Sequence, residues 1–517
     1  METFIKDRYD NYEVLTGEVA APEPDLICFY NARKANNMLY KHIQNNSRTA
    51  IHSDVDCDGI GSTYIIHKFM SEFGMRSKMG VCINKDKVHG VSQAHIDFFN
   101  NSGAELIIIV DSSTNDIEYI KQFNCDVLVV DHHEILHKEL SGETAGGEYV
   151  IVNNNIDNTD VEFGLYKADD RMSGAMVLYE MLRLYQHSFK TPDILKATLL
   201  YQWVGLTLFT DSVSTLTLRN QYYLDLTVHN INTEDGLKKI MNSLSKWQGS
   251  LDKSFINYKI APAFNRAIRA GYSALALNIA IYTPEKAYEL ERFKEIQDKI
   301  CENCMEGVME YSQYSLKDMT SSGIHKNYCG LLANKVLDHT NKSTVAYITD
   351  GEYAAGSFRG KHSYIDYRGF IDNWSEDTFA QGHKSAFGFM VKIDELPQLM
   401  LEVTNLEKEV STKEYITAGR LLDEYKGTHH IDDFDKFKRE GLLWRLAMAN
   451  SKLSTEDSIS IVIPNENIKL LETRGKVFYY GVFNLKCQAF EEMTTPLLDL
   501  YVEYNKEMKI YLKNKWR

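Results

Sequence analysis

The sequence is poor in proline and in long apolar runs, and it has no excess of positive charge. It holds 8 Pro and 30 Gly among 517 residues, without a low-complexity segment or an internal repeat, which argues against long disordered linkers. No stretch approaches the ~18 apolar residues that a membrane span needs. Residues 1–8 lack the apolar core of a secretory signal. We therefore expect folded domains in the cytoplasm, without a membrane partner.

The eight cysteines are scattered along the chain, as is typical of proteins from a reducing cytoplasm. Cys301 and Cys304 form one C-x-x-C pair. A zinc site needs two further ligands at matching spacing, and the sequence offers none nearby. The pair falls in a helical pattern, where positions three apart share a face, so we interpret both as buried thiols.

The composition gives a formal net charge of −15, from 57 basic and 72 acidic residues. This weakens any claim of tight, non-specific binding to duplex nucleic acid. It leaves room for a local basic groove, and bound cations would offset acids that lie in metal-binding motifs. A content of 44% hydrophobic and 25% charged residues permits normal cores, and the length suggests roughly three or four domains.

Four apolar segments, read as buried strands, end in acidic or imidazole side chains. They are residues 50–52 before the acidic loop 53–59, residues 106–110 before Asp111, residues 127–130 before Asp131, His132 and His133, and residues 205–210 before Asp211. Short runs of this kind are typical of parallel sheets covered on both faces. Because ligands gather beyond the carboxyl ends of such strands, we expect these polar side chains to meet at one edge.

The acidic loop by itself has two interpretations. His52, Asp54, Asp56 and Asp58 are spaced by two residues, so that in extended chain their side chains point the same way. They would repel one another without a counter-ion, although a solvated loop that caps a helix explains this segment equally well. Together with the other strand ends the pattern favours a metal site.

The number of candidate ligands exceeds what one ion needs. Two divalent ions that share a bridging carboxylate are the usual arrangement for hydrolysing phosphate esters. Mixed carboxylate and imidazole ligands favour Mn²⁺, with Mg²⁺ as the alternative.

The order of elements predicts an α/β protein. Strands and helices alternate from about residue 47 to 225, which indicates a doubly wound parallel sheet. Residues 284–312 have the apolar spacing of a long connecting helix, and a second, smaller α/β region and a mixed α+β region follow. The expected boundaries are an N-terminal extension at 1–46, a catalytic domain at 47–240, a helical connector at 241–320, a substrate domain at 321–398 and a C-terminal domain at 399–517.

These motifs resemble the DHH phosphoesterase superfamily. His52, Asp56 and Asp58 match its first motif, Asp111 its second, Asp131-His132-His133 its third and Asp211 its fourth. The resemblance implies that one ion is held by His52, Asp56 and Asp111, and the other by Asp58, Asp111, His132 and Asp211. It further implies that His133 contacts the scissile phosphate, that Asp54 supports the metals or the water, and that Asp131 has a supporting role.

Further segments are similar to the RecJ-like branch of that superfamily. Residues 260–269 resemble its IAPRLNAAGR segment, although Ile268 replaces a glycine. Residues 356–359 and 382–388 resemble the GSxRS and GGHxxAAG motifs of the DHH-associated domain, with Gln381 and Phe387 as departures. The resemblance implies phosphate-binding roles for Asn265, Arg269, Ser357, Arg359, Gly382 and His383. Glycines let backbone N–H groups approach a phosphate, and Arg359 can bind it with two bonds.

The expected function is that of a RecJ-like exonuclease on single-stranded DNA, acting 5′→3′ and serving DNA repair or recombination, with replication or recombination proteins as partners. Two alternatives stay open: a phosphodiesterase of short oligonucleotides or cyclic dinucleotides, and a non-catalytic scaffold. The C-terminal strands at 459–463 and 476–483 permit an oligonucleotide-binding barrel. Tyr479, Tyr480 and Phe483 there are interpreted as core rather than as base-stacking residues.

Overall fold

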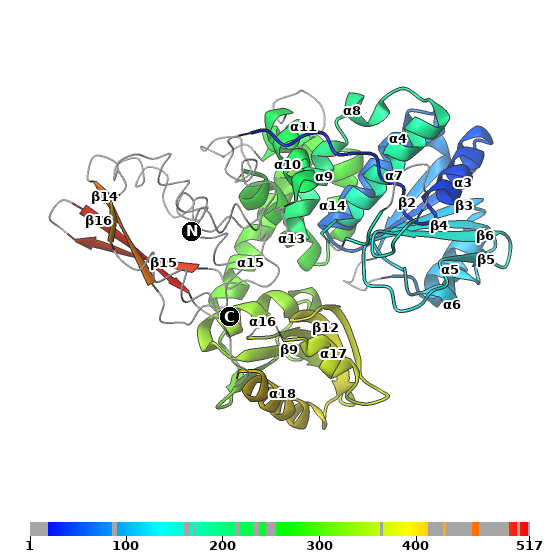
Figure 1. Ribbon diagram of the computed structural model, residues 1–517. Helices are drawn as coiled ribbons and strands as arrows, with labels where there is room; N and C mark the ends of the chain where they lie inside the picture. Colours follow the sequence, from blue (N-terminus) through cyan, green and yellow to red (C-terminus); the bar gives the residue numbers. More distant parts are fainter. Residues whose placement is uncertain are drawn as a thin grey trace. The chain divides into compact units, whose positions relative to one another are not determined.

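The computed structural model places the chain in two compact units. One comprises residues 20–294, and the other combines residues 1–19 with residues 295–517. The described residues are 19–84, 90–159, 166–169, 171–211, 213, 217–230, 237–244, 255–361 and 365–411, with four C-terminal strands at 428–430, 458–464, 496–503 and 507–514. Figure 1 shows the elements coloured along the sequence. No helix among these residues is both long and apolar enough to cross a membrane.

The unit of residues 20–294 is built on a six-stranded sheet with the order β2-β1-β3-β4-β6-β5. Its strands are β1 Thr49–Ser53, β2 Met79–Ile83, β3 Leu106–Val110, β4 Asp126–Asp131, β5 Ser141–Glu143 and β6 Glu148–Asn153. All pairs are parallel except that β5 adds an antiparallel edge. Strands β1, β3 and β4 are buried along their whole length. The predicted parallel sheet is thereby confirmed.

Helices cover both faces of this sheet, as the doubly wound interpretation requires. Side chains of α5 (Gln93–Ser102) and α6 (Ile117–Ile120) join a core with Ile107, Val127 and Ile151 on one face. On the other face, α4 (Cys57–Ser71), α7 (Gly174–Phe189) and α3 (Ala32–Gln44) contact β1, β4 and β6. The chain therefore enters α4 directly from the carboxyl end of β1, where the acidic loop lies.

Beyond α7, the described residues of this unit form further helices. They are α8 Ile194–Ala197, α9 Tyr201–Thr210, α10 Leu218–Asn230, α11 Leu237–Ser243, the π-helix η2 Ile256–Ile260, α13 Ala261–Arg269, α14 Ser273–Ile281 and the 3₁₀ helix η3 Pro284–Glu291. The strand predicted at residues 205–210 is wrong, because this segment belongs to α9. An apolar run cannot separate a buried strand from a helix that is buried on all sides, and α9 is buried nearly throughout.

The single connecting helix predicted at residues 284–312 is also wrong. The chain forms η3, then α15 (Arg292–Glu302), and then turns into β7 (Val308–Glu310). Apolar side chains three apart fit a 3₁₀ helix as well as an α-helix, so their spacing alone did not reveal the change. The division between the two compact units falls inside the predicted helical connector.

The second unit contains a six-stranded mixed sheet with the order β11-β12-β10-β9-β8-β7. The further strands are β8 Tyr314–Asp318, β9 Ser343–Thr349, β10 Tyr353–Arg359, β11 Phe379–His383 and β12 Ala386–Lys392. Only β8 and β9 pair in parallel. Helix α16 (Cys329–Thr340) lies on one side of the sheet, and α18 (Leu396–Ser411) on the other with α17 (Tyr367–Asp372).

A four-stranded sheet with the order β13-β14-β16-β15 is described near the C-terminus. Its strands are β13 Thr428–His430, β14 Ser458–Pro464, β15 Pro496–Glu503 and β16 Glu507–Asn514. The predicted strand at 459–463 is confirmed as β14. The one predicted at 476–483, with Tyr479, Tyr480 and Phe483, lies outside the described residues, and the barrel stays a prediction. Of the C-x-x-C pair, Cys304 is buried and Cys301 is half-buried.

A buried ion cluster ties α10 to α7. The Glu180 side chain is completely buried and accepts hydrogen bonds from Arg183 (2.8 Å), Arg219 (2.5 Å) and the Tyr223 hydroxyl (2.7 Å). Removing the carboxylate leaves two guanidinium groups without their buried counter-charge.

We therefore predict that Glu180→Ala lowers the free energy of unfolding of this unit by about 3–5 kcal/mol, measured by thermal and urea denaturation. Glu72, exposed and paired with Lys68 at 2.7 Å, is the matched control, and Glu72→Ala is expected to change the free energy by less than about 1 kcal/mol. Equal effects of the two substitutions would contradict the prediction.

Candidate metal centre

The carboxyl ends of β1, β3 and β4 place the acidic groups side by side. Strands β3 and β4 run in register, with Val110 opposite Val130, so the residues that follow leave the sheet together. The backbone N–H of Asp111 donates to the Val130 carbonyl at 2.8 Å, and that of Asp54 donates to the Val110 carbonyl at 3.3 Å. The polar ends predicted for these three strands therefore do lie at one edge.

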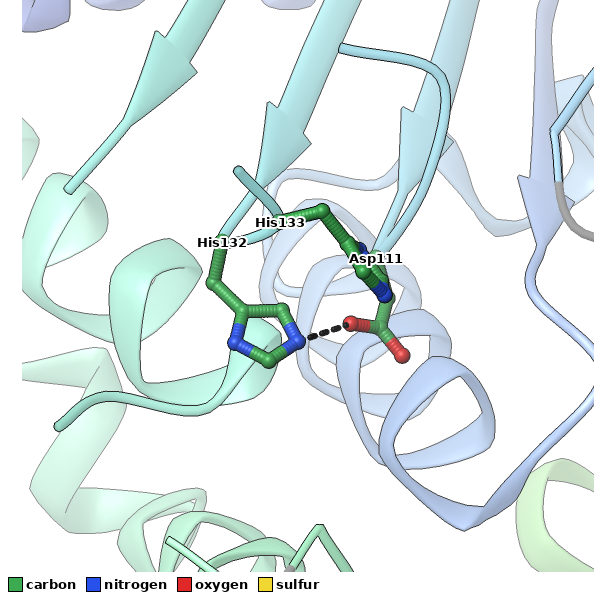
Figure 2. Close-up of side chains that lie close together, drawn as sticks. All are labelled: Asp111, His132 and His133. Atoms are coloured by element: carbon green, nitrogen blue, oxygen red, sulfur yellow. Dashed lines mark ion pairs between the residues drawn. The ribbon is translucent and has the colours of Figure 1, made fainter. Parts of the chain in front are cut away.

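Figure 2 shows His132 turned toward Asp111 beside His133. The His132 Nε2 atom lies 3.3 Å from Asp111 Oδ1, 3.6 Å from Asp211 Oδ2 and 4.0 Å from Asp58 Oδ2. Its Nδ1 atom lies 2.9 Å from the Met172 carbonyl. Since a carbonyl only accepts, Nδ1 donates to it, and Nε2 is the ring nitrogen that faces the carboxylates. This is the orientation that a metal-binding imidazole adopts.

Three overlapping groups of side chains have ligand atoms within 4.8 Å of one another. They are Asp54 with Asp56 and Asp111, Asp58 with His132 and Asp211, and Asp111 with His132 and His133. Asp111 and His132 each belong to two groups, which links the groups into one cluster. Oxygen and imidazole donors of this kind suit Mn²⁺ and also Mg²⁺. The Oδ1 atom of Asp111 is buried and accepts no hydrogen bond from the described residues, so the cluster fits divalent ions.

The buried carboxylates repel one another. Burial, with the charge of Asp211 next, raises the pKa of Asp58 well above its ordinary value. Burial, with the charge of Asp58 next, does the same to the pKa of Asp111. Backbone φ at Asp111 is +64°, in the left-handed region that non-glycine residues seldom adopt. A cation between these groups would favour their ionised forms and offset the repulsion.

The N-terminus of α7 contacts two of these acids. The N–H groups of Gly174 and Ala175 donate to the Asp58 carboxylate at 2.6 and 3.0 Å. A Cβ on Gly174 would lie 2.4 Å from Asp111 Oδ1, closer than non-bonded carbon and oxygen atoms approach, so a larger residue here would require Asp111 to shift. No role was predicted for residues 172–175 from the sequence. The sequence signal for this contact is the helix N-cap Ser173 followed by Gly174.

Asp131 holds His133 in place. Its carboxylate is fully buried and accepts from His133 Nδ1 at 2.7 Å, and the Thr114 N–H donates to it at 3.0 Å. Burial alone would lower the pKa of His133, but the charge of Asp131 and this hydrogen bond raise it to about 10. The same partners hold the pKa of Asp131 well below its ordinary range against the effect of burial. His133 is thus an imidazolium at neutral pH, suited to an anionic oxygen.

His52 lies apart from the three groups. Its Nδ1 atom is 3.4 Å from Cys82 Sγ, and its ring lies 4.6 Å from that of His95. Burial, followed by the charge of His95, lowers its pKa to about 3, so the imidazole is neutral. The geometry places Asp54, rather than His52, with Asp56 and Asp111. The metal-binding role assigned to His52 stays a prediction.

Asp56 is also a helix cap. Its Oδ1 atom accepts from the N–H groups of Asp58 and Gly59 at 2.9 and 3.0 Å, at the start of α4. The two interpretations of the acidic loop are therefore compatible, because one oxygen caps the helix while the carboxylate remains within the cluster with Asp54 and Asp111.

The predicted phosphate-binding residues lie on three other elements. Asn265 and Arg269 are half-buried, four residues apart on α13, which contacts α4 and α9. Ser357 and Arg359 alternate along β10 in the second unit. Gly382, with φ +134°, and His383 end β11. Their roles stay predictions.

Residues 48–203 match the family model described as the DHH family, N-terminal domain. This part of the chain is similar to the DHH family. Its third motif gives the family its name, and here Asp131 orients His133 while His132 faces the acids. The matched residues carry the first three motifs.

The comparisons also show that the chain has a RecJ-like fold. A relative from Bacillus subtilis (strain 168), whose name describes it as a putative SPbeta prophage-derived single-strand DNA-specific exonuclease, YorK, is 22% identical over 451 residues, which is 76% of this chain and 73% of the relative. The crystal structure of RecJ from Thermus thermophilus in complex with Mn²⁺ matches 86% of this chain with a TM-score of 0.62 at 15% identity. The same protein in complex with Mg²⁺ matches 88% of this chain with a TM-score of 0.57. The chain described here spans 64% of the length of the Mn²⁺-bound RecJ.

We predict that Gly174→Ala weakens Mn²⁺ binding at least about ten-fold, because the new methyl group displaces Asp111. Isothermal titration calorimetry measures the affinity. Gly80 on β2 is the matched control, since a Cβ there would meet nothing within 4 Å, and Gly80→Ala should bind Mn²⁺ like the unmodified protein. Unchanged affinity in Gly174→Ala would contradict the close approach.

We predict that Asp131→Asn lowers the pKa of His133 from about 10 to the ordinary histidine value of about 6.5 or below. Because the folded-state pKa lies above the unfolded value, the ion pair stabilises the fold fully below about pH 6.5, and this contribution is lost as the pH rises toward 10. An NMR titration of the histidine ring carbons measures both pKa values. A His133 that titrates near 6.5 in the unmodified protein would contradict the ion pair.

Proposed function

We propose that the chain is a metal-dependent exonuclease that hydrolyses single-stranded DNA from the 5′ end and releases mononucleotides. The observation that carries the proposal is the cluster of overlapping ligand groups that share Asp111 and His132 at the carboxyl edge of the sheet, with the charged His133 beside them. The name of the YorK relative supports the substrate. The polarity rests on the RecJ-like resemblance.

The side chains divide into two neighbouring positions for divalent ions, for which Mn²⁺ is favoured. Asp54, Asp56 and Asp111 would hold one ion, and Asp58, His132 and Asp211 the other, with Asp111 reaching both. Such ions, when bound, lower the pKa of an attacking water and neutralise charge on phosphoryl oxygens. By the resemblance His52 would also contact the first ion.

The protein's own groups would position the phosphate. His133, held charged by Asp131, would donate from Nε2 to a non-bridging oxygen of the scissile phosphate, where negative charge develops during hydrolysis. The N–H groups of Gly174 and Ala175 hold the Asp58 carboxylate in one orientation. Asn265 and Arg269 on α13, with Ser357, Arg359, Gly382 and His383 on the second sheet, would bind other phosphates of the strand. Partners in replication or recombination, and a cytoplasmic role in repair, stay predictions.

The test is a time course on single-stranded DNA labelled at the 5′ or the 3′ end, with Mn²⁺. We expect immediate release of labelled mononucleotide from the 5′-labelled substrate, and a loss of more than about 100-fold in the Asp131→Ala/His132→Ala variant, because metal-coordinating and phosphate-stabilising groups each contribute factors of that size.

Each other outcome points to a different function. Release from the 3′ label first would reverse the polarity. Cleavage confined to substrates of two to four nucleotides, or to cyclic dinucleotides, would make the protein a small-substrate phosphodiesterase. Cleavage of neither, in protein shown by elemental analysis to contain Mn²⁺, would favour a scaffold.

A further inference from the structure

One half of the second sheet has a face that carries both cationic and apolar side chains. Strands β10, β12 and β11 lie side by side, and their register places residues in rows across the sheet. Ser357, Gly388 and Gln381 form one row. In the next row along the strands, Met390 of β12 is directly opposite Phe379 of β11. We call the surface made by Arg359, Ser357, Gly388, Gln381, Met390 and Phe379 the open face.

The opposite face of the same strands is core. Alternate residues of β10 and β12, such as Phe358, Phe389 and Val391, pack in one cluster with Tyr367 of α17 and Met400 of α18. Because successive side chains of a strand point to opposite faces, Arg359, Ser357 and Met390 must point away from this core. The exposed fractions agree, since Phe379 is 50% and Met390 is 37% exposed.

Helix α16 lies over the neighbouring part of that face, where it contacts β9 and β10, and it also contacts β12. Its Leu332 and Ala333 pack in a cluster with Ala346 of β9, which pairs with Ser357. A Cβ on Gly330, in the first turn of α16, would lie 2.7 Å from Arg359 Nη2 and 3.4 Å from Ser357 Oγ. The N-terminus of α16 therefore lies over Ser357 and Arg359 and adjoins the part of the open face that carries Met390 and Phe379.

The open face has its positive charge at one end, where a phosphate of a nucleic-acid strand could bind. Burial raises the pKa of Cys329, the first residue of α16. The positive charges of Arg359 and Lys326 oppose this rise. No acidic residue lies in the first turn of α16. Cations and the positive end of a helix thus gather at one end of the surface. Beyond Met390 and Phe379, the Lys392 ammonium forms an ion pair with the Asp377 carboxylate at 2.5 Å.

A nucleotide has the same two-part chemistry, with an anionic phosphate joined to an apolar aromatic base. Ser357 and the row of Met390 are two residues apart along the strands, which is roughly 7 Å, comparable to the reach from a phosphate to its base. Gly388, in the row of Ser357 and next to Met390 on this face of β12, adds no side chain there. Isolated exposed apolar side chains need no explanation, but this pair adjoins the predicted phosphate-binding residues on one continuous sheet surface.

We propose that Phe379 and Met390 form a stacking surface for bases of the single strand whose phosphates Ser357 and Arg359 bind. This inference rests on the proposed function, because it names how the substrate of that same enzyme is held. Stacking is indifferent to sequence, since every base has a flat π-face, and it requires an unpaired base. The open face therefore contributes to the preference for single strands without any sequence readout.

The test compares two uncleavable ligands on the full chain with Mn²⁺, by fluorescence anisotropy. One is a phosphorothioate-linked dodecathymidylate, and the other is an abasic chain of the same length, linkage and charge. We expect Phe379→Ala/Met390→Ala to bind the thymidylate about ten-fold more weakly, which is the size of one lost stacking contact, and the abasic chain as tightly as the unmodified protein does. Phe379→Trp should retain the binding of thymidylate.

The control is Phe98→Ala, which truncates a phenylalanine that is 61% exposed on α5, and it should leave both affinities unchanged. Equal binding of thymidylate by the double variant and the unmodified protein, or an equal loss for both ligands, would overturn the stacking role. So would a change confined to self-association, measured by sedimentation, which would make the open face a protein interface. Failure of the proposed function is separate, because the unmodified protein would then not digest labelled DNA at all.

Discussion

The repulsion among carboxylates buried at the end of a parallel sheet is the constraint on which the unit of residues 20–294 depends. Burial and mutual charge raise the pKa values of Asp58 and Asp111 well above their ordinary range, so these groups stay ionised only where a positive charge faces them. The Nε2 atom of His132 faces the same carboxylates. Bound divalent ions would offset this repulsion, and part of their binding free energy would arise from that relief.

The surrounding elements hold the buried acids and His133 in position. The N-terminus of α7 binds Asp58 through two N–H groups, and Gly174 lets the helix approach Asp111. Asp131, fixed by Thr114, holds His133 charged at the rim of the cluster. The ion cluster centred on Glu180 joins α10 to α7. Positive partial and formal charges thus face the acids from several directions, which is electrostatic preorganisation of the kind that phosphate chemistry uses.

Much of this could be anticipated from the chain alone, and the failures have specific causes. Runs such as residues 106–110 predicted strands correctly, because β-branched residues bounded by polar ends have few alternatives. Residues 205–210 were misassigned, because a helix buried on all sides has the same apolar composition. Residues 284–312 were expected to form one helix, yet the chain changes from 3₁₀ to α geometry within them. His52 and Asp54 are spaced alike in the sequence, and only the geometry groups Asp54 with Asp56 and Asp111.

The resemblance to the DHH family, the parallel sheet and the acids and histidines at its edge all followed from the order of residues, because strand periodicity and strand-end chemistry are local properties. Three-dimensional packing was needed to establish which oxygen and nitrogen atoms meet, that α7 supplies backbone N–H groups to Asp58, and that Phe379 lies opposite Met390 on an exposed face. These features depend on how residues distant in the sequence pack together. No local pattern encodes that packing, since it follows from the shape of the whole core.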